Sequence, residues 1–338
     1  MTKYLTWFLV FMLCSCSMTT KRDVKINGVS FVASRDSISN ENIQPVLNVN
    51  ANYTAIMPFG FIKSLEHPEI IYNTDRQWFG ETNAGVSQYI DVLQKANLRV
   101  MMKPQIWVWH GEFTGHIKMP NEAAWFELEQ TYSRFILDFA KLAQEKQIAI
   151  FCIGTELEQF VAHRQEYWQE LIMNIRVVYD GKLTYAANWD EYKRTPFWSD
   201  LDYIGVDAYF PISDKKTPSV DDAIVGWQAH KMEMKAISEK FDKPILFTEF
   251  GYRSTDYTGK EPWVSDYKIT ALNLDAQTNT TQALFDVFWK EPWFAGGFVW
   301  KWFHNHEESG GETDNQFTPQ NKPVEAVIRS HYNLSLKM

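Results

Sequence analysis

The sequence predicts a single (β/α)8 barrel of the α/β class, with long loops after several of its strands. From residue 24 onward, apolar segments of strand length alternate with amphipathic segments of helix length, which is the pattern of parallel α/β folds. Several of the eight strand segments are continuous apolar blocks, as expected for strands that are covered on both faces. No Gly-, Ser- or Pro-rich linker divides the 338 residues, and single α/β barrels reach this length.

The individual elements follow from their length and spacing. We expect strands at Val29–Ala33, Tyr53–Met57, Arg99–Lys103, Ile148–Ile153, Leu183–Ala186, Tyr203–Val206, Ile245–Thr248 and Gly297–Trp300. Apolar residues at three-to-four spacing predict helices at Val86–Leu93, Phe126–Leu142, Trp168–Val178, Ala223–Phe241 and Ala271–Trp289. Asn121 and Asp221 are expected to begin two of these helices. Long irregular segments at 58–85, 104–120 and 301–321 each follow a strand, and such loops form the working face of a barrel.

The N-terminus has the features of a secretory signal. One early positive charge precedes a short apolar stretch, which is too short to span a bilayer, and small residues follow it. The Leu13-Cys14-Ser15-Cys16 run resembles the lipobox of bacterial lipoproteins. This reading makes 1–15 a signal peptide, Cys16 a lipidated residue, 16–23 a tether and 24–338 the barrel domain. It places the protein in the bacterial cell envelope, anchored to a membrane at the cell surface or the periplasmic face. The alternative is an ordinary cleaved signal in which Cys16 is incidental.

Composition excludes some partners and favours others. The chain has 33 Lys+Arg against 42 Asp+Glu and no long basic run, which argues against nucleic acid as a partner. Aromatic residues make up 15% of the chain, including 14 Trp. This surplus favours flat ligands such as sugar rings, although an aromatic-rich core is the ordinary alternative. Of three cysteines, only Cys152 is expected to remain free in the mature chain, as a buried small apolar residue.

Two predicted strands end in a carboxylate. Glu156 follows the fourth strand and Glu249 ends the seventh, so both are expected at the C-terminal mouth of the barrel, where burial can shift their pKa values. Two carboxylates in different environments are the minimum requirement for hydrolysis of a glycosidic bond. Glu158 is a rival for the role of acid. For either glutamate alone, capping of a helix or pairing with an arginine is an equally ordinary explanation.

Together, several short motifs resemble glycoside hydrolase family 113. They are Gly154-Thr155-Glu156, Tyr203-Ile204-Gly205-Val206-Asp207-Ala208-Tyr209-Phe210-Pro211, Thr248-Glu249-Phe250-Gly251-Tyr252 and Gly296-Gly297-Phe298-Val299-Trp300-Lys301-Trp302. The resemblance covers nearly the whole mature chain. It implies a β-mannanase-like retaining enzyme that needs no cofactor, acts on β-linked mannose-containing glycans and is of the endo-β-1,4 type. It also implies Glu156 as general acid/base and Glu249 as nucleophile.

The same resemblance suggests residues that bind substrate. The expected set is Lys103, Trp109, Asn188, Trp189, Tyr209, Trp300 and Trp302. Gln105 stands where many relatives have His, and Thr155 stands where much of the clan has Asn. Tyr209 is expected to donate a hydrogen bond to the nucleophile, and Trp300 to form the floor of the −1 subsite.

Three further expectations complete the interpretation. The segment His304-Asn305-His306-Glu307-Glu308 superficially resembles a metal-ligand cluster, but no His-X-His closes the first strand, and no metal site is expected. The expected partners are an oligo- or polysaccharide and, through the lipid, a membrane; the protein is expected to be a monomer. The alternatives are a silent surface glycan-binding lipoprotein, a transglycosylase, and a β-glycosidase with another sugar specificity on the same fold.

Overall fold

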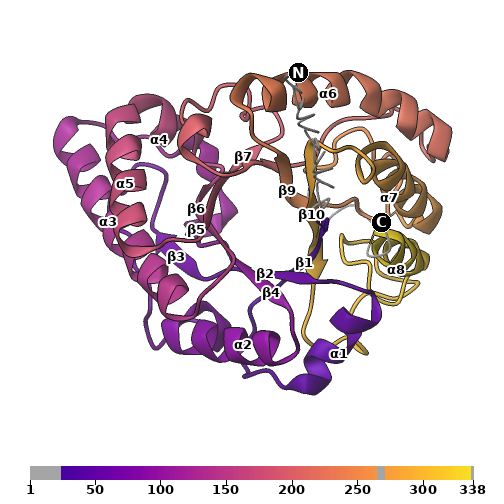
Figure 1. Ribbon diagram of the computed structural model, residues 1–338, viewed down its shortest axis with the longest axis horizontal. Helices are drawn as coiled ribbons and strands as arrows, with labels where there is room; N and C mark the ends of the chain where they lie inside the picture. The colour runs from indigo at the N-terminus through magenta and orange to yellow at the C-terminus, as the bar shows by residue number, and fades with distance from the viewer. Residues whose placement is uncertain (1–23, 265–270, 336–338) are drawn as a thin grey trace, which may run out of the picture.

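The computed structural model describes residues 24–264 and 271–335, and these form a closed barrel of eight parallel strands surrounded by helices (Figure 1). The strands are β1 (Ile26–Phe31), β2 (Tyr53–Ile56), β4 (Arg99–Met102), β6 (Ile150–Thr155), β7 (Lys182–Asn188), β8 (Ile204–Asp207), β9 (Ile245–Phe250) and β10 (Phe294–Trp302). The ring closes because β1 pairs in parallel with both β2 and β10. The predicted (β/α)8 barrel is confirmed, and each of its eight strands overlaps a predicted one.

Two short strands lie outside the barrel. β3 (Phe59–Ile62) and β5 (Gln105–Val108) form a separate parallel pair in which Phe59 lies opposite Gln105. Two residues separate β3 from the end of β2, and two separate β5 from the end of β4, so the pair extends that side of the barrel beyond its mouth. We expected these stretches to be irregular, and the prediction was wrong here because their alternating burial is short and lies within loop-like sequence.

The predicted helices are present, and the described part of the chain contains three more. α2 (Asn83–Lys95), α3 (Glu122–Glu145), α5 (Gln165–Val178), α6 (Val220–Phe241) and α7 (Leu274–Phe288) correspond to the predicted ones. The additional helices are α1 (Asn40–Asn48), α4 (Glu158–His163) and α8 (Pro323–Ser335). Short 3-10 turns lie at η1 (Phe79–Glu81), η2 (Trp109–Gly111), η3 (Thr114–His116) and η4 (Trp198–Asp200).

The helix starts are set by capping side chains. Asn121 caps α3 as predicted and accepts a 3.0 Å hydrogen bond from the Ala124 N–H. The cap of α6 is Ser219 rather than Asp221, because the Ser219 hydroxyl accepts from the Asp222 N–H while the Asp222 carboxylate accepts from the Ser219 N–H. A reciprocal cap of this kind satisfies two backbone donors and is worth about 1 kcal/mol.

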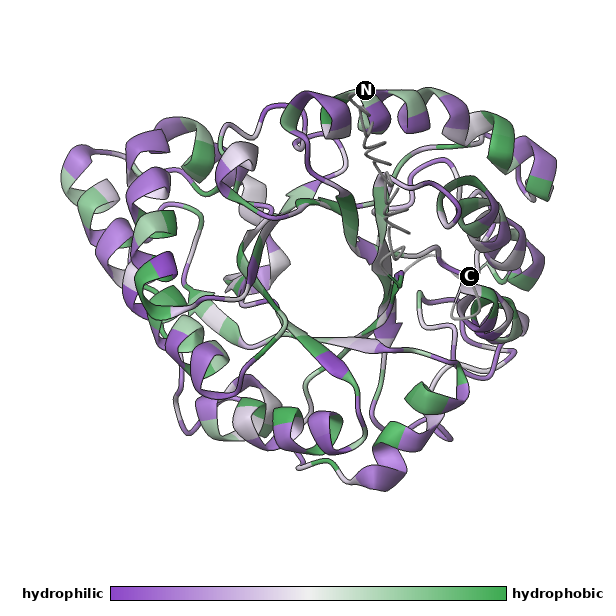
Figure 2. Cartoon of the chain, in the orientation of Figure 1, coloured by the Kyte–Doolittle hydropathy of each residue, from purple (hydrophilic) through white to green (hydrophobic). Residues whose placement is uncertain are grey.

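The core has two parts. The larger part fills the layer between the barrel and the helices, and Figure 2 shows the apolar strands enclosed by helices of mixed hydropathy. The smaller part is a floor inside the N-terminal end of the barrel, formed by Ile26, Tyr53, Ala55, Met101, Ile150, Leu246 and Phe298. Gly28 allows this packing, because a Cβ at that position would lie 2.3 Å from the Phe298 ring. The ends of the strands opposite this floor are where Lys103, Asp207 and Glu249 lie.

The expectations for the N-terminal segment fall outside the described residues. The predicted signal peptide (1–15), lipidated Cys16 and tether (16–23) all precede residue 24. Within residues 24–264 and 271–335, no helix combines the length and the apolar character that crossing a bilayer requires.

Candidate active site

The C-terminal mouth of the barrel carries a cluster of buried charges. Glu249 lies in β9 and Glu156 directly follows β6, with β7 and β8 between these two strands in the ring. Asp207 ends β8, and Lys103 follows β4. Parallel strands deliver all four side chains to the same end of the barrel. Their charges interact, because both Asp207 and Glu249 raise the pKa of Glu156. The two glutamates predicted from the strand ends are thus brought into one site.

The Glu249 carboxylate is held by three donors. Its Oε1 lies 2.5 Å from Lys103 Nζ and also accepts a 3.1 Å hydrogen bond from Gln105 Nε2. Its Oε2 accepts a 2.8 Å hydrogen bond from the Tyr209 hydroxyl. The side chain is only 6% exposed. Donors to both oxygens fix the orientation of the carboxylate.

Lys103 joins Glu249 to a second buried carboxylate. Its Nζ lies 3.0 and 3.1 Å from the two oxygens of Asp207, and Oδ1 of Asp207 also accepts from the Thr248 hydroxyl at 2.7 Å. Burial raises the pKa of Asp207 to about 7, and the Glu249 charge contributes to the rise. Burial alone would lower the pKa of Lys103, but the two carboxylates outweigh it and the pKa is raised. Lys103 is therefore a fully buried, permanently charged ammonium.

Glu156 has the opposite environment. Among residues 24–264 and 271–335, no side chain or backbone donor hydrogen-bonds its carboxylate, which is partly exposed at the mouth. Burial raises its pKa well above 4.5, and the charges of Asp207 and Glu249 raise it further. The side chain is thus biased toward the protonated acid. Its rival Glu158 begins α4 and is ion-paired with Arg194 instead.

The aromatic residues at the end of β10 separate into two groups. Trp300 is partly exposed and lies beside Lys301, whose ammonium is 5.6 Å from the Trp300 ring centre and 5.1 Å from that of Phe303. Trp302 is 0% exposed and belongs to the core between barrel and helices, so it is not available to stack on a sugar. The predicted binding role of Trp302 was wrong, because an irregularity in the β1–β10 register turns its side chain toward the helices.

A second aromatic group follows β7. Trp189 stacks on Trp263, with ring centres 5.2 Å apart and planes inclined by 16°. Trp263 is 41% exposed, and sequence reasoning missed it because it lies in a long loop with no regular pattern. Asn188 is partly exposed, and its Oδ1 accepts from the Trp189 N–H at 2.8 Å. Trp109, by contrast, is 62% exposed in η2, and its ring contacts His110.

The sequence analysis also missed a buried carboxyl group. Glu191 is 2% exposed; its Oε1 accepts from the Tyr185 hydroxyl at 2.7 Å and its Oε2 from the Asn188 N–H at 3.0 Å. Burial raises the pKa of Glu191 to about 8. It does not end a strand, so the signal that identified Glu156 and Glu249 does not apply to it.

The histidine segment after β10 has a structural role. His306 Nε2 lies 3.2 Å from a carboxylate oxygen of Glu325 in α8, and the His304 carbonyl accepts from the Asn42 side chain. Across the described parts of the chain, no group of three or more His, Cys, Asp or Glu side chains is arranged to hold a metal ion.

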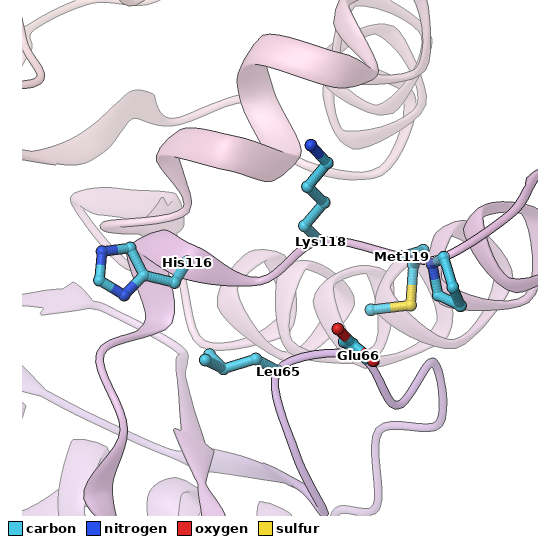
Figure 3. Close-up of a pocket in the computed structure, with 6 residues that line it drawn as sticks. Leu65, Glu66, His116, Lys118 and Met119 are labelled. Carbon is cyan, nitrogen blue, oxygen red and sulfur yellow. The ribbon is translucent and has the colours of Figure 1, made fainter.

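A surface cavity of about 380 Å³ lies away from the charged cluster. Leu65 and Glu66 line it from the loop after β3, and His116, Lys118 and Met119 line it from the segment around η3 (Figure 3). Neither Glu156 nor Glu249 contributes to its walls.

Two carboxyl groups at strand ends of a closed parallel barrel, one held by cationic and neutral donors and the other biased toward its acid form, define the class of barrel glycoside hydrolases. The sequence profile of Glycoside Hydrolase Family 113 matches residues 33–322, and the chain belongs to this family. It is therefore a glycoside hydrolase. Comparison with curated proteins found no match.

Solved structures of other proteins share this fold. A GH113 β-1,4-mannanase, solved as a complex, superposes with a TM-score of 0.79 at 22% identity, over 91% of this chain and 99% of that one. The GH113 β-mannanase from Alicyclobacillus acidocaldarius, in complex with ManMIm, gives 0.78 at 23% identity, over 92% and 98%. The β-glucuronidase of Faecalibacterium prausnitzii gives 0.63 at 14% identity, over 92% of this chain and 49% of its own.

Proposed function

We propose that this glycoside hydrolase cleaves β-linked mannose-containing glycans with retention of configuration, Glu249 serving as nucleophile and Glu156 as general acid/base. The observation that carries the proposal is the contrast between the two carboxyl groups. Glu249 accepts from Lys103, Gln105 and Tyr209, whereas Glu156 has none of these donors and a raised pKa. A nucleophile must be ionised and a general acid must keep its proton, so the environments match the two roles.

The reaction takes two displacements. Glu156 gives its proton to the glycosidic oxygen while a carboxylate oxygen of Glu249 attacks the anomeric carbon, so that the bond to the leaving sugar breaks as the glycosyl-enzyme ester forms. Glu156, now ionised, then removes a proton from water, whose oxygen attacks the same carbon and releases Glu249. This mechanism requires the two carboxyl groups to be about 5–5.5 Å apart.

The remaining residues at the mouth suit a neutral sugar chain. Trp300 is partly exposed on β10, the strand that pairs with β9, and the Trp189–Trp263 pair offers a second aromatic surface. Apolar ring faces with a few oriented polar groups are the usual means of binding such ligands. The choice of mannose is supported by the two family 113 structures named above, both of which are β-mannanases.

Azide rescue tests the roles separately. With an activated aryl β-mannoside, Glu249→Ala should lose turnover and regain part of it with azide, giving the α-glycosyl azide. Glu156→Ala should still form the glycosyl-enzyme, which azide captures as the β-glycosyl azide. Products of the same configuration from both variants would contradict the assignment. Wild-type protein that binds mannan or mannooligosaccharides without cleaving them would indicate a silent binding protein. Elongation of oligosaccharides with little reducing sugar released would indicate a transglycosylase.

We also propose that Cys16 carries a lipid that anchors the enzyme to the bacterial cell envelope. The support is the Leu13-Cys14-Ser15-Cys16 run after a short apolar stretch. Wild-type protein should enter the detergent phase on phase separation, whereas Cys16→Ser should remain in the aqueous phase. Equal partitioning of both would contradict the anchor.

A further inference from the structure

The backbone at Glu156 adopts a conformation that its side chain disfavours. Its φ is +50°, in the left-handed region, where a residue with a Cβ is strained. Such a conformation persists only where the surrounding contacts impose it. The contacts that hold it therefore control where the Glu156 carboxyl group lies.

Both hydrogen bonds that hold this backbone come from the neighbouring strand β7. The Glu156 N–H donates to the Ala186 carbonyl at 2.8 Å. The next N–H, that of Leu157, donates to the Tyr185 hydroxyl at 2.6 Å instead of to a carbonyl. One side of the strained residue is thus fixed by backbone and the other by a side chain.

The Tyr185 hydroxyl is itself oriented by Glu191. Because its oxygen accepts from Leu157, its proton is free to donate, and it lies 2.7 Å from Glu191 Oε1. The other oxygen of Glu191 accepts from the Asn188 N–H. Tyr185 and Glu191 are 0% and 2% exposed, so water does not substitute for either partner. Two successive hydrogen bonds, Glu191–Tyr185 and Tyr185–Leu157, thus link the loop after β7 to the residue after Glu156.

We propose that Glu191 is a positioning residue for the general acid, acting through Tyr185 on the backbone that carries Glu156. The proposal rests on the proposed acid/base role of Glu156. It assigns a purpose to a buried carboxyl group that ends no strand and has no direct part in the two displacements. The raised pKa of Glu191, caused by burial, reflects how far this group is removed from solvent.

Substrates with different leaving groups distinguish a loss of proton donation by Glu156 from a general disturbance of the fold. Departure of a dinitrophenolate needs no proton, whereas departure of a sugar does. The value of kcat/KM reports the step in which the leaving group departs, so it can be compared between a dinitrophenyl β-mannoside and a mannooligosaccharide. The variants are Tyr185→Phe, which keeps the ring, and Glu191→Gln, whose amide N–H₂ cannot accept from Asn188 or Tyr185.

We expect both variants to lower kcat/KM on the oligosaccharide at least tenfold and to change it less than twofold on the aryl glycoside. The matched control is Tyr192→Phe, because the Tyr192 hydroxyl is buried and has no hydrogen-bond partner in the described chain. It should leave both values unchanged. Equal losses on both substrates, or no loss on either, would overturn the positioning role. If Glu191→Gln fails to fold, Tyr185→Phe alone decides.

Glu156→Gln, measured in parallel, distinguishes failure of this inference from failure of the proposed function. If Glu156→Gln shows the selective loss and the other two variants do not, only the positioning role is wrong. If Glu156→Gln itself shows no selectivity, the acid/base assignment is wrong.

Discussion

Lys103 Nζ lies 2.5 Å from Glu249 Oε1, and both groups are almost fully withdrawn from solvent. The same ammonium contacts Asp207, so one cation pairs with two buried carboxyl groups. Removing one partner of a buried ion pair strongly destabilises a protein, because the remaining charge stays buried without compensation.

Replacing the buried cation should be among the most damaging changes at the mouth. Lys103→Met leaves Asp207 and Glu249 facing each other without a counter-charge, so we expect a loss of about 3–5 kcal/mol in the free energy of unfolding and of nearly all activity. Urea unfolding and kcat measure the two effects. Lys193→Met is the control, since the Lys193–Glu233 pair is exposed and should contribute less than about 1 kcal/mol. Comparable losses in the two variants would contradict the role of the cluster.

The Tyr209 hydroxyl should matter for turnover more than for stability. Tyr209→Phe removes the donor to Glu249 Oε2 and keeps the ring, which packs edge-on against Phe317. A hydrogen bond to a charged group is worth about 1.5–3 kcal/mol, so kcat should fall about tenfold to hundredfold. Steady-state kinetics on a mannooligosaccharide measures this, with thermal unfolding as a check on folding. A kcat within twofold of wild type would show that this contact does not orient the nucleophile.

The raised pKa of Glu156 predicts how stability changes with pH. Above pH 4.5 the unfolded chain releases this proton, while the folded protein keeps it until the higher folded pKa is reached. The stability of wild type relative to Glu156→Gln should therefore fall as pH rises through this window. Urea unfolding of both proteins from pH 4.5 to 8 measures the difference. Glu158→Gln is the control, because Glu158 is ion-paired with Arg194. If the free energy of unfolding of wild type rose with pH relative to that of Glu156→Gln, the prediction would be contradicted.

Trp263 and Trp302 should respond to substitution in opposite ways. Trp263 is partly exposed and stacked on Trp189, so Trp263→Ala should raise KM for long oligosaccharides several-fold and change stability little. Trp302 is fully buried, so Trp302→Ala should cost about 3–5 kcal/mol of unfolding free energy. Kinetics at several substrate lengths and denaturant unfolding check this pair. A KM effect confined to Trp302 would reverse the assignment.

The barrel was predictable because its strands carry a strong and redundant signal. Segments such as Ile245–Thr248 are apolar on both faces, and eight of them in alternation with helices leave few other folds. Helices with weak sequence signals were not predicted. α1 has Pro45 in its interior and only two buried residues, and α4 is six residues long. In both, tertiary contacts rather than local periodicity stabilise the helix.

The site was predictable where a side chain ends a strand and not where contacts cross between strands. Glu156 and Glu249 could be placed from the strand ends alone. The bridge from Lys103 to Asp207, and the role of Gln105 as a donor to Glu249, depend on which strands are neighbours and on their stagger. Trp302 was misassigned because one register irregularity reverses the face of every residue after it.

The apolar floor of the barrel closes one end of its interior, so the site is reached from the other end. Ile26, Met101 and Phe298 are among the side chains that seal the far end, so a saccharide reaches Glu249 from the loop side and departs by the same route. A long saccharide would have to lie across the rim, because the described residues of the floor close the other end of the barrel. Under the two-displacement mechanism proposed above, the leaving sugar would have to depart over the rim before water reaches the ester, so its departure would fall between the two displacements.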